Sequence, residues 1–97
     1  MDTKIQNYIS EIQNAEKIYW SSNGYDMTKI PEITVTKAKK FYKIWIKTFG
    51  QTSIHCFVDF EGKIYKPATW QAPAKGIRGN VNNDKKPLLC GDFYRYR

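Results

Sequence analysis

The sequence predicts an α+β domain in which an N-terminal amphipathic helix packs on a small antiparallel β-meander that a long C-terminal loop segment follows. Two observations support this prediction. Apolar residues recur at helical spacing near the N-terminus, and from Lys40 onward the apolar period changes to two. The chain has 97 residues, of which 41% are hydrophobic and 15% aromatic. A chain of this length supports one hydrophobic core, so residues 1–97 are expected to form a single domain.

The predicted helix covers residues 3–20. Thr3 and Gln6 have the spacing of a capping box at a helix start. The pair Asn23-Gly24 follows and readily adopts the left-handed conformation that ends helices. Between these signals one helical face is apolar and carries Ile5, Tyr8, Ile9, Ile12, Ala15 and Tyr19. Residues 25–39 are predicted to be a connection with one edge strand near Ile33-Thr36, since Pro31 interrupts them.

Three strands are predicted between residues 41 and 66, separated by turns at residues 50–52 and 61–62 and ended by Pro67. Each strand alternates between two faces. The first face carries Tyr42, Ile44, Ile46, Ile54, Cys56, Val58 and Phe60, and the second carries Phe41, Lys43, Trp45, Lys47, Phe49, Ser53, His55, Phe57 and Asp59. The helix is expected to cover the first face. Residues 67–97 have the composition of a loop, with three prolines and three glycines.

Charge is unevenly distributed along the chain. Residues 1–27 hold two lysines against four acidic residues, a net charge of −2, whereas residues 28–97 hold fourteen basic against five acidic residues, a net charge of +9. A field of this kind favours a polyanionic partner, although high basicity also serves solubility alone. No apolar run approaches the length that crosses a bilayer, and the N-terminus lacks a signal-peptide core. The expected location is the cytoplasm, without a membrane partner, where Cys56 and Cys90 remain free thiols.

The second sheet face is the first candidate binding surface. Trp45 lies between Lys43 and Lys47 on that face, and other aromatic residues surround it. Aromatic rings stack on bases while neighbouring lysines contact phosphates, which is how sheets hold single-stranded nucleic acid. The alternative interpretation is a second core layer, covered by the C-terminal segment, with the lysines at its rim.

The segment from Lys66 to Asn80 is the second candidate. Its glycines allow close backbone approach, and Lys75 and Arg78 together with exposed amides could converge on an anion. It is not a Walker loop, because the spacing of glycine, lysine and hydroxyl residue differs. A rigid turn built by Pro, Gly and Trp70, with solvated basic residues, explains the same composition.

The same segment, with the strands before it, is similar in sequence to a group of known proteins. KIYKPATWQAPAKGIRGNV, with the preceding FYKIW and SIHCFVDFEG, resembles the core of small uncharacterised bacteriophage proteins that share a K-x-A-x-W-x-A-P-A-K-x-x-R-G-N string. The resemblance covers residues 41–81. It implies a phage accessory protein that acts in the cytoplasm of the host cell, on host or antiphage-defence machinery, and it assigns no activity.

Catalysis and metal binding are not expected. The chain has one histidine, and alternation along a strand places the adjacent His55 and Cys56 on opposite faces, where they could not form a dyad. Two cysteines and one histidine also lack paired metal-ligand spacing, and no cofactor motif is present. Asp59 and Glu61 are expected to form a turn and balance charge.

The sequence therefore predicts a non-enzymatic binding protein whose ligand is nucleic acid or a nucleotide. The expected ligand-binding residues are Lys43, Trp45, Lys47, Lys66, Trp70, Lys75, Arg78 and Asn80. The C-terminal Phe93-Tyr94-Arg95-Tyr96-Arg97 either grips the ligand or forms a last edge strand. Two alternatives use the same residues: a protein that inhibits a host or antiphage-defence enzyme, since Tyr, Trp and Arg are enriched at interface hot spots, and a virion or scaffolding component.

Overall fold

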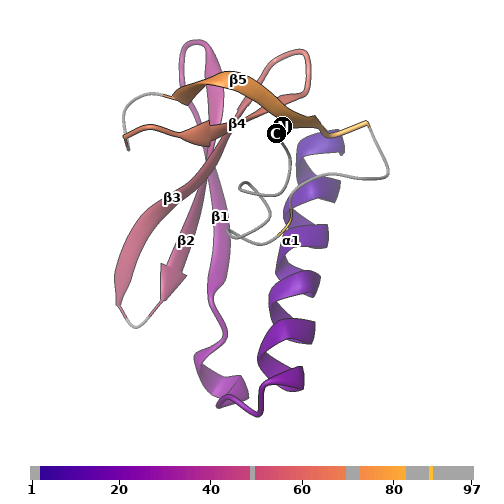
Figure 1. Cartoon of the computed structure of the whole chain (residues 1–97), viewed down its shortest axis with the longest axis vertical. Helices are drawn as coiled ribbons and strands as arrows, with labels where there is room; N and C mark the ends of the chain where they lie inside the picture. The colour runs from indigo at the N-terminus through magenta and orange to yellow at the C-terminus, as the bar shows by residue number, and fades with distance from the viewer. Residues whose placement is uncertain (1–2, 49, 70–72, 83–87, 89–97) are drawn as a thin grey trace.

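In the computed structural model the described residues form one helix, one 3-10 turn and a five-stranded antiparallel sheet (Figure 1). The structure describes residues 3–48, 50–69, 73–82 and 88, and only the backbone of Met27 and Arg78. The elements are α1 (Thr3–Ser22), η1 (Met27–Lys29), β1 (Glu32–Lys37), β2 (Phe41–Thr48), β3 (Gln51–Asp59), β4 (Lys63–Pro67) and β5 (Pro73–Asn80). The strands lie in chain order, so every neighbouring pair is a simple meander connection. The predicted α+β class, a helix on a β-meander, is confirmed.

Helix α1 continues two residues beyond the predicted end at residue 20 and stops at the Asn23-Gly24 pair. The backbone N–H and the side-chain amide of Asn23 both donate to the carbonyl oxygen of Tyr19, at 3.1 and 2.8 Å. Gly24 takes a φ of 70°, in the left-handed region where a glycine has no Cβ to clash. The N–H of Tyr25 then bonds the carbonyl of Trp20 at 3.0 Å. These bonds satisfy the last carbonyls of the helix and reverse the chain toward the sheet.

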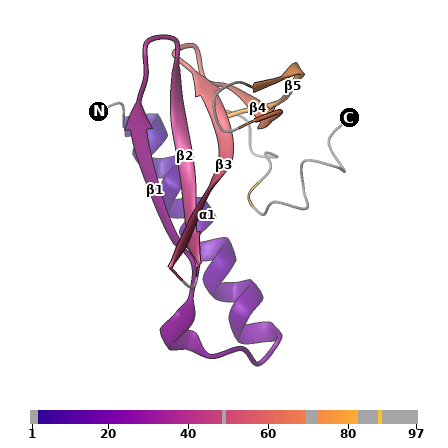
Figure 2. The ribbon, with the colours of Figure 1, turned by 90° about the vertical axis from the view of Figure 1, so that its left-hand side faces the viewer.

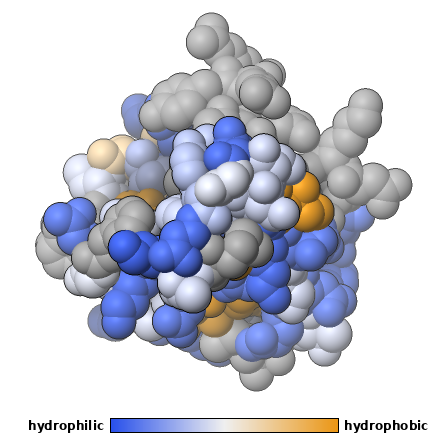
Figure 3. All heavy atoms as spheres, turned by 90° about the horizontal axis from the view of Figure 1, so that it is seen from below, coloured by the Kyte–Doolittle hydropathy of each residue, from blue (hydrophilic) through white to orange (hydrophobic). Residues whose placement is uncertain are grey.

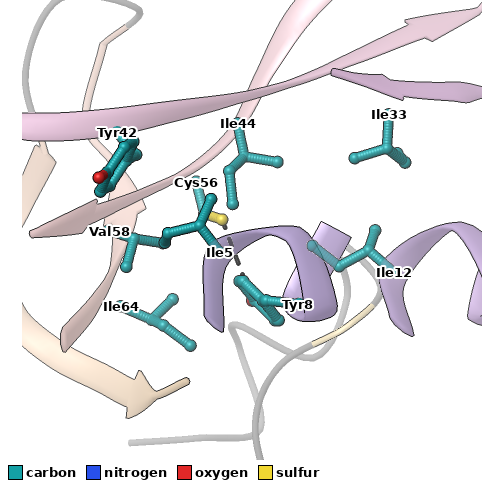
Figure 4. Close-up of a cluster of buried hydrophobic side chains, with 9 residues drawn as sticks. All are labelled: Ile5, Tyr8, Ile12, Ile33, Tyr42, Ile44, Cys56, Val58 and Ile64. Atoms are coloured by element: carbon teal, nitrogen blue, oxygen red, sulfur yellow. Dashed lines mark hydrogen bonds between the residues drawn. The ribbon is translucent and has the colours of Figure 1, made fainter. Parts of the chain in front are cut away.

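The core lies between α1 and the first predicted sheet face. Figure 4 shows Tyr8 of the helix pointing toward Cys56 of the sheet, with the hydroxyl oxygen 4.0 Å from Sγ. Burial of each large apolar side chain stabilises the fold by about 1.5–3 kcal/mol. The buried cluster comprises Ile5, Tyr8, Ile12, Ile33, Tyr42, Ile44, Cys56, Val58 and Ile64. The prediction that the helix covers the Tyr42 and Ile44 face is therefore confirmed.

Gln13 of α1 joins the helix to the edge strand β1, which forms where the sequence predicts one. Its side-chain nitrogen donates to the carbonyl oxygen of Pro31 at 2.9 Å, and its side-chain oxygen accepts from the N–H of Ile33 at 3.1 Å. The amide of one side chain thus occupies the donor and acceptor that a neighbouring strand would otherwise use. Such occupation fixes the helix against the sheet and blocks part of an edge that could pair with another chain.

Residues 73–80 differ from the prediction, because β5 forms within the segment expected to be loop. β5 pairs antiparallel with β4, so Tyr65 lies opposite Ile77 and Ile64 opposite Gly79. Pairing with β4 supplies the hydrogen bonds that overcome the low strand propensity of Pro73, Gly76 and Gly79. The irregular register between Tyr65 and Pro67 accommodates Gly76, whose φ is 97°. Beyond Asn82, the structure describes only Leu88, which packs against the core.

Replacing Gln13 with alanine tests the connection between α1 and β1. Gln13→Ala leaves the Pro31 carbonyl and the Ile33 amide without this partner, so we expect the free energy of unfolding to fall by about 1–2 kcal/mol. Urea denaturation followed by circular dichroism measures this free energy of unfolding. The adjacent, exposed Asn14→Ala is the matched control and should change stability by no more than about 0.5 kcal/mol. Equal effects of the two substitutions would contradict this role of Gln13.

Candidate nucleic-acid interface

The sheet has one face that α1 does not cover. Figure 2 looks onto this face, where β1, β2 and β3 lie in front of α1. We call it the outer face. Strand register places a row of side chains across it, because directly opposite residues of antiparallel strands share a face. From β1 to β5 this row is Thr36, Lys43, Phe57, Tyr65 and Ile77.

Lys43, Trp45 and Lys47 lie in line along the outer face of β2, and we call these three residues the β2 stripe. Successive side chains on one face of a strand are about 6.6–7 Å apart. Lys47 is exposed, whereas Lys43 and Trp45 are half-buried. The indole Nε1–H of Trp45 donates to Oγ1 of Thr36 at 2.9 Å. This bond holds the indole across β1, so the ring is oriented before any ligand arrives.

The positive charge of this region is concentrated on the β1–β2 hairpin. Residues 32–48 contain five lysines and one acidic residue, Glu32, a net charge of +4. Lys37 is directed away from the outer face, because it lies opposite Tyr42 in register and its Nζ is 5.5 Å from the ring centroid of Phe60. Lys39 and Lys40 are exposed in the turn between the strands. Charge thus lies both on the outer face and around the hairpin.

Part of the predicted aromatic surface is packed into a second layer. Phe57 is fully buried on the outer face. The ring of Phe41 packs edge-on against Phe57 and Tyr65, with ring centroids 5.8 and 6.0 Å apart. Rings therefore pack on one another at the β3–β4 side, while Trp45 remains partly open at the β1–β2 side. The C-terminal segment that this interpretation placed over the layer lies mostly outside the described residues. Phe49 lies outside the described residues.

Asp59 organises the β3–β4 turn, as the sequence predicts. Its Oδ1 accepts from the backbone N–H groups of Glu61 and Lys63, at 3.0 and 2.9 Å. Its Oδ2 accepts from the Tyr65 hydroxyl at 3.2 Å. Burial and this hydrogen bond raise the pKa of Tyr65, so the phenol stays protonated.

Lys63 is held in an ion pair beside the same turn. Its Nζ lies 3.3 Å from Glu61 Oε2, and the hydrogen bond to that carboxylate raises the pKa of Lys63. The charge of Lys63 is thus compensated locally. Together with the hydrogen bonds of Asp59, this pair gives the acidic residues of the turn a structural role.

Lys66, Lys75 and Asn80 lie on β4 and β5, separated from the β2 stripe by β3. Lys75 is exposed and Lys66 half-buried. Oδ1 of Asn80 accepts from the backbone and side-chain nitrogens of Asn82, at 2.9 and 3.0 Å, so this residue closes a turn. Trp70 and the Arg78 side chain lie outside the described residues. The predicted residues that the structure describes therefore fall into two groups, of which Lys43, Trp45 and Lys47 lie together on one strand face.

A β-bulge at His55 overturns the prediction that His55 and Cys56 point apart. Ile44 pairs with Cys56 and Trp45 with Ile54, which makes His55 the extra residue of β3. The bulge places His55 Nδ1 3.3 Å from Cys56 Sγ. It also moves Ile54 to the outer face opposite Trp45, whereas strict alternation placed Ile54 beside Cys56. No glycine or proline marks the bulge in the sequence.

Hydrogen bonding indicates the tautomer of His55. Its Nε2 lies 2.9 Å from the carbonyl oxygen of Leu88, which can only accept, so Nε2 carries the proton. In the neutral ring Nδ1 then accepts from the thiol of Cys56, and the sulfur lies 4.0 Å from the Tyr8 hydroxyl. Only about 1% of His55 is exposed, and Cys56 is fully buried. The thiol and the imidazole are thus both enclosed by the fold.

The described residues also give two negative findings. They contain no group of three His, Cys, Asp or Glu side chains placed to hold a metal ion. Within the same residues, no helix combines the length and apolar character needed to cross a membrane.

The fold and the outer face define the class of this molecule: a small α+β domain with one helix-covered sheet face and one face that carries lysines beside a tryptophan. Comparison with protein families matches residues 2–92 to a family of unknown function, DUF7717. The chain therefore belongs to the DUF7717 family. Searches of curated proteins and of solved structures gave no match.

Substitution of His55 tests the structural role of the bulge. In a Cys90→Ser background, where Cys56 is the remaining thiol, His55→Ala should lower the free energy of unfolding by about 2–3 kcal/mol. It should also speed labelling of Cys56 by a thiol reagent under native conditions. The exposed Ser53→Ala on the same strand is the control. Rapid labelling of Cys56 with His55 intact would contradict the enclosed pair.

Proposed function

We propose that this chain is a phage accessory protein that binds single-stranded nucleic acid on its outer face in the host cytoplasm. The observation that carries the proposal is the β2 stripe. A partly exposed indole, fixed by Thr36, lies between two lysines on one strand face.

Stacking and charge neutralisation act together at such a surface. An unpaired base can stack on the Trp45 indole, while the ammonium groups of Lys43 and Lys47 contact the phosphates on either side. The bases of a duplex are already stacked and paired, so they cannot reach the indole in this way. Thr34 and Thr36, which pair with Trp45 and Lys43 in register, add hydroxyl groups, but these do not distinguish one base from another. The proposal is therefore of a ligand that is single-stranded and sequence-tolerant.

The test is binding of fluorescein-labelled oligo(dT), measured by fluorescence anisotropy over a range of salt concentrations. Lys47→Ala should weaken binding and lower the salt slope by about one. Trp45→Leu, which retains apolar cover but removes the ring, should weaken binding by about 1–3 kcal/mol. Lys17→Ala on the exposed surface of α1 removes the same charge elsewhere and should leave binding nearly unchanged.

Two results would count against the proposal. One is binding of oligo(dT) that does not depend on salt. The other is an equal loss for Lys17→Ala and Lys47→Ala, which would indicate that net charge, and not the β2 stripe, attracts the ligand.

A protein-targeting inhibitor is the second candidate function, and a different surface favours it. Ile18, Tyr19 and Tyr25 are 59%, 45% and 47% exposed near the end of α1. Tyr25 also packs edge-on against Trp20, with ring centroids 5.0 Å apart, so the exposed ring is held in place. Ordered aromatic residues of this kind anchor protein interfaces. Tyr19→Ser and Tyr25→Ser would abolish capture of a host protein from nuclease-treated lysate under this alternative, and would leave oligo(dT) binding intact under the first.

A further inference from the structure

An open groove of about 350 Å³ lies where the β2 stripe ends. Its lining comes from η1, the start of β1, the end of β2 and the β2–β3 turn, and comprises Thr28, Lys29, Ile30, Glu32, Lys47 and Gly50. A volume of this size falls within the range of small-molecule sites. Figure 3 views the molecule from below, the side on which η1 and the end of α1 lie, and shows a largely hydrophilic surface.

Two lysines from separate elements line this groove. Lys29 comes from η1 and Lys47 from β2, and both are exposed. Glu32 also lines the groove and lies opposite Lys47 in the β1–β2 register. Two cations against one carboxylate leave the groove with a net charge of +1. The position of Lys29 is supported by Asp26, whose Oδ1 accepts from the Thr28 N–H and hydroxyl at 2.9 and 2.7 Å.

Lys47 belongs to both the groove and the β2 stripe. An anionic chain that follows the stripe from Lys43 past Trp45 therefore reaches the groove next. β2 ends at Thr48, immediately beyond Lys47, so the strand that carries the stripe ends there as well. The groove is thus the place where the end of a bound strand would lie.

Resting on the proposed function, we infer that this groove binds a phosphomonoester, the terminal phosphate of the bound nucleic-acid strand. A phosphomonoester carries a charge of about −1.5 to −2 at neutral pH, whereas each internal phosphodiester carries −1. Lys29, the lysine that the groove adds to Lys47, therefore contributes more to binding a terminal phosphate than to binding an internal one. The carboxylate of Glu32 repels the phosphate and so weakens this attraction.

The experiment compares oligo(dT) with a 5′-phosphate, with a 3′-phosphate and with neither, again by fluorescence anisotropy. Wild-type protein should bind one phosphorylated form about two- to fivefold more tightly than the unphosphorylated form, the range expected for an exposed ion pair. Lys29→Ala should remove this preference and leave binding of unphosphorylated oligo(dT) nearly unchanged. Glu32→Gln should enlarge the preference. Lys40→Ala, an exposed lysine in the turn at the other end of β1 and β2, is the matched control and should retain it.

Competition by thymidine monophosphate tests whether the groove instead binds a free nucleotide. This mononucleotide cannot occupy the groove and the whole β2 stripe together, so it should compete far more weakly than the phosphorylated oligonucleotide. Competition of equal strength would overturn the assignment to a strand end.

The remaining outcomes separate this inference from the proposed function. Equal binding of all three oligonucleotides would overturn the groove assignment and leave the proposed function standing. Loss of the preference in Lys40→Ala as well as Lys29→Ala would also overturn it, because the effect would then be one of net charge. Absence of binding to every oligonucleotide would remove the proposed function itself.

Discussion

One helix can cover only one face of a sheet, and the arrangement of this domain follows from that constraint. Ile5, Tyr8 and Ile12 of α1 bury the face of the sheet that carries Ile44 and Cys56. Among the described residues, side chains of the opposite face either pack against one another or stay partly exposed. Packing of this kind joins Phe41, Phe57 and Tyr65, whereas Trp45 and the residues around it stay partly exposed. The β2 stripe is therefore accessible because of where the helix packs.

The β-bulge in β3 determines how the two faces differ. Without it, Ile54 would share a face with Cys56, and His55 would lie on the outer face near Trp45. The bulge places His55 and Cys56 together in the interior and sets Ile54 opposite Trp45. An apolar residue thus neighbours the indole on the outer face, and the imidazole forms a part-buried hydrogen bond to the Leu88 carbonyl. The groove at the end of β2 depends on a further local feature, the η1 turn that positions Lys29.

Local signals in the sequence predicted the parts of the fold that rest on local physics. The capping pair and Asn23-Gly24 predicted α1, and alternation predicted β2, β3 and β4 with the Tyr42 and Ile44 face inward. Non-local pairing was not predictable in the same way. β5 contains Pro73 and Gly79, and it becomes a strand because β4 lies beside it. The bulge at His55 leaves no compositional mark, so alternation assigned Ile54 and His55 to the wrong faces.

Sequence also identified the β2 stripe but grouped it with residues that lie elsewhere. Lys43, Trp45 and Lys47 share one strand, so alternation alone brings them together. Lys75 and Asn80 share with them only charge and polarity, and the fold places them beyond β3. Lys29 was not among the predicted ligand residues, because the turn that carries the chain from α1 to β1 brings it to the groove that Lys47 also lines. The signal available was a single lysine two residues before Pro31, and one lysine by itself does not indicate a binding site.

The central claim is that the ligand lies on the outer face over Trp45. Its most direct measurement is a titration of ¹⁵N-labelled protein with oligo(dT), followed through the indole N–H cross-peaks of the tryptophans and assigned by substitution. The account predicts that the Trp45 indole signal moves most, since stacking changes both its ring environment and its bond to Thr36, while Trp20 on α1 changes little. A titration that shifts Trp20 and leaves Trp45 unmoved would contradict it.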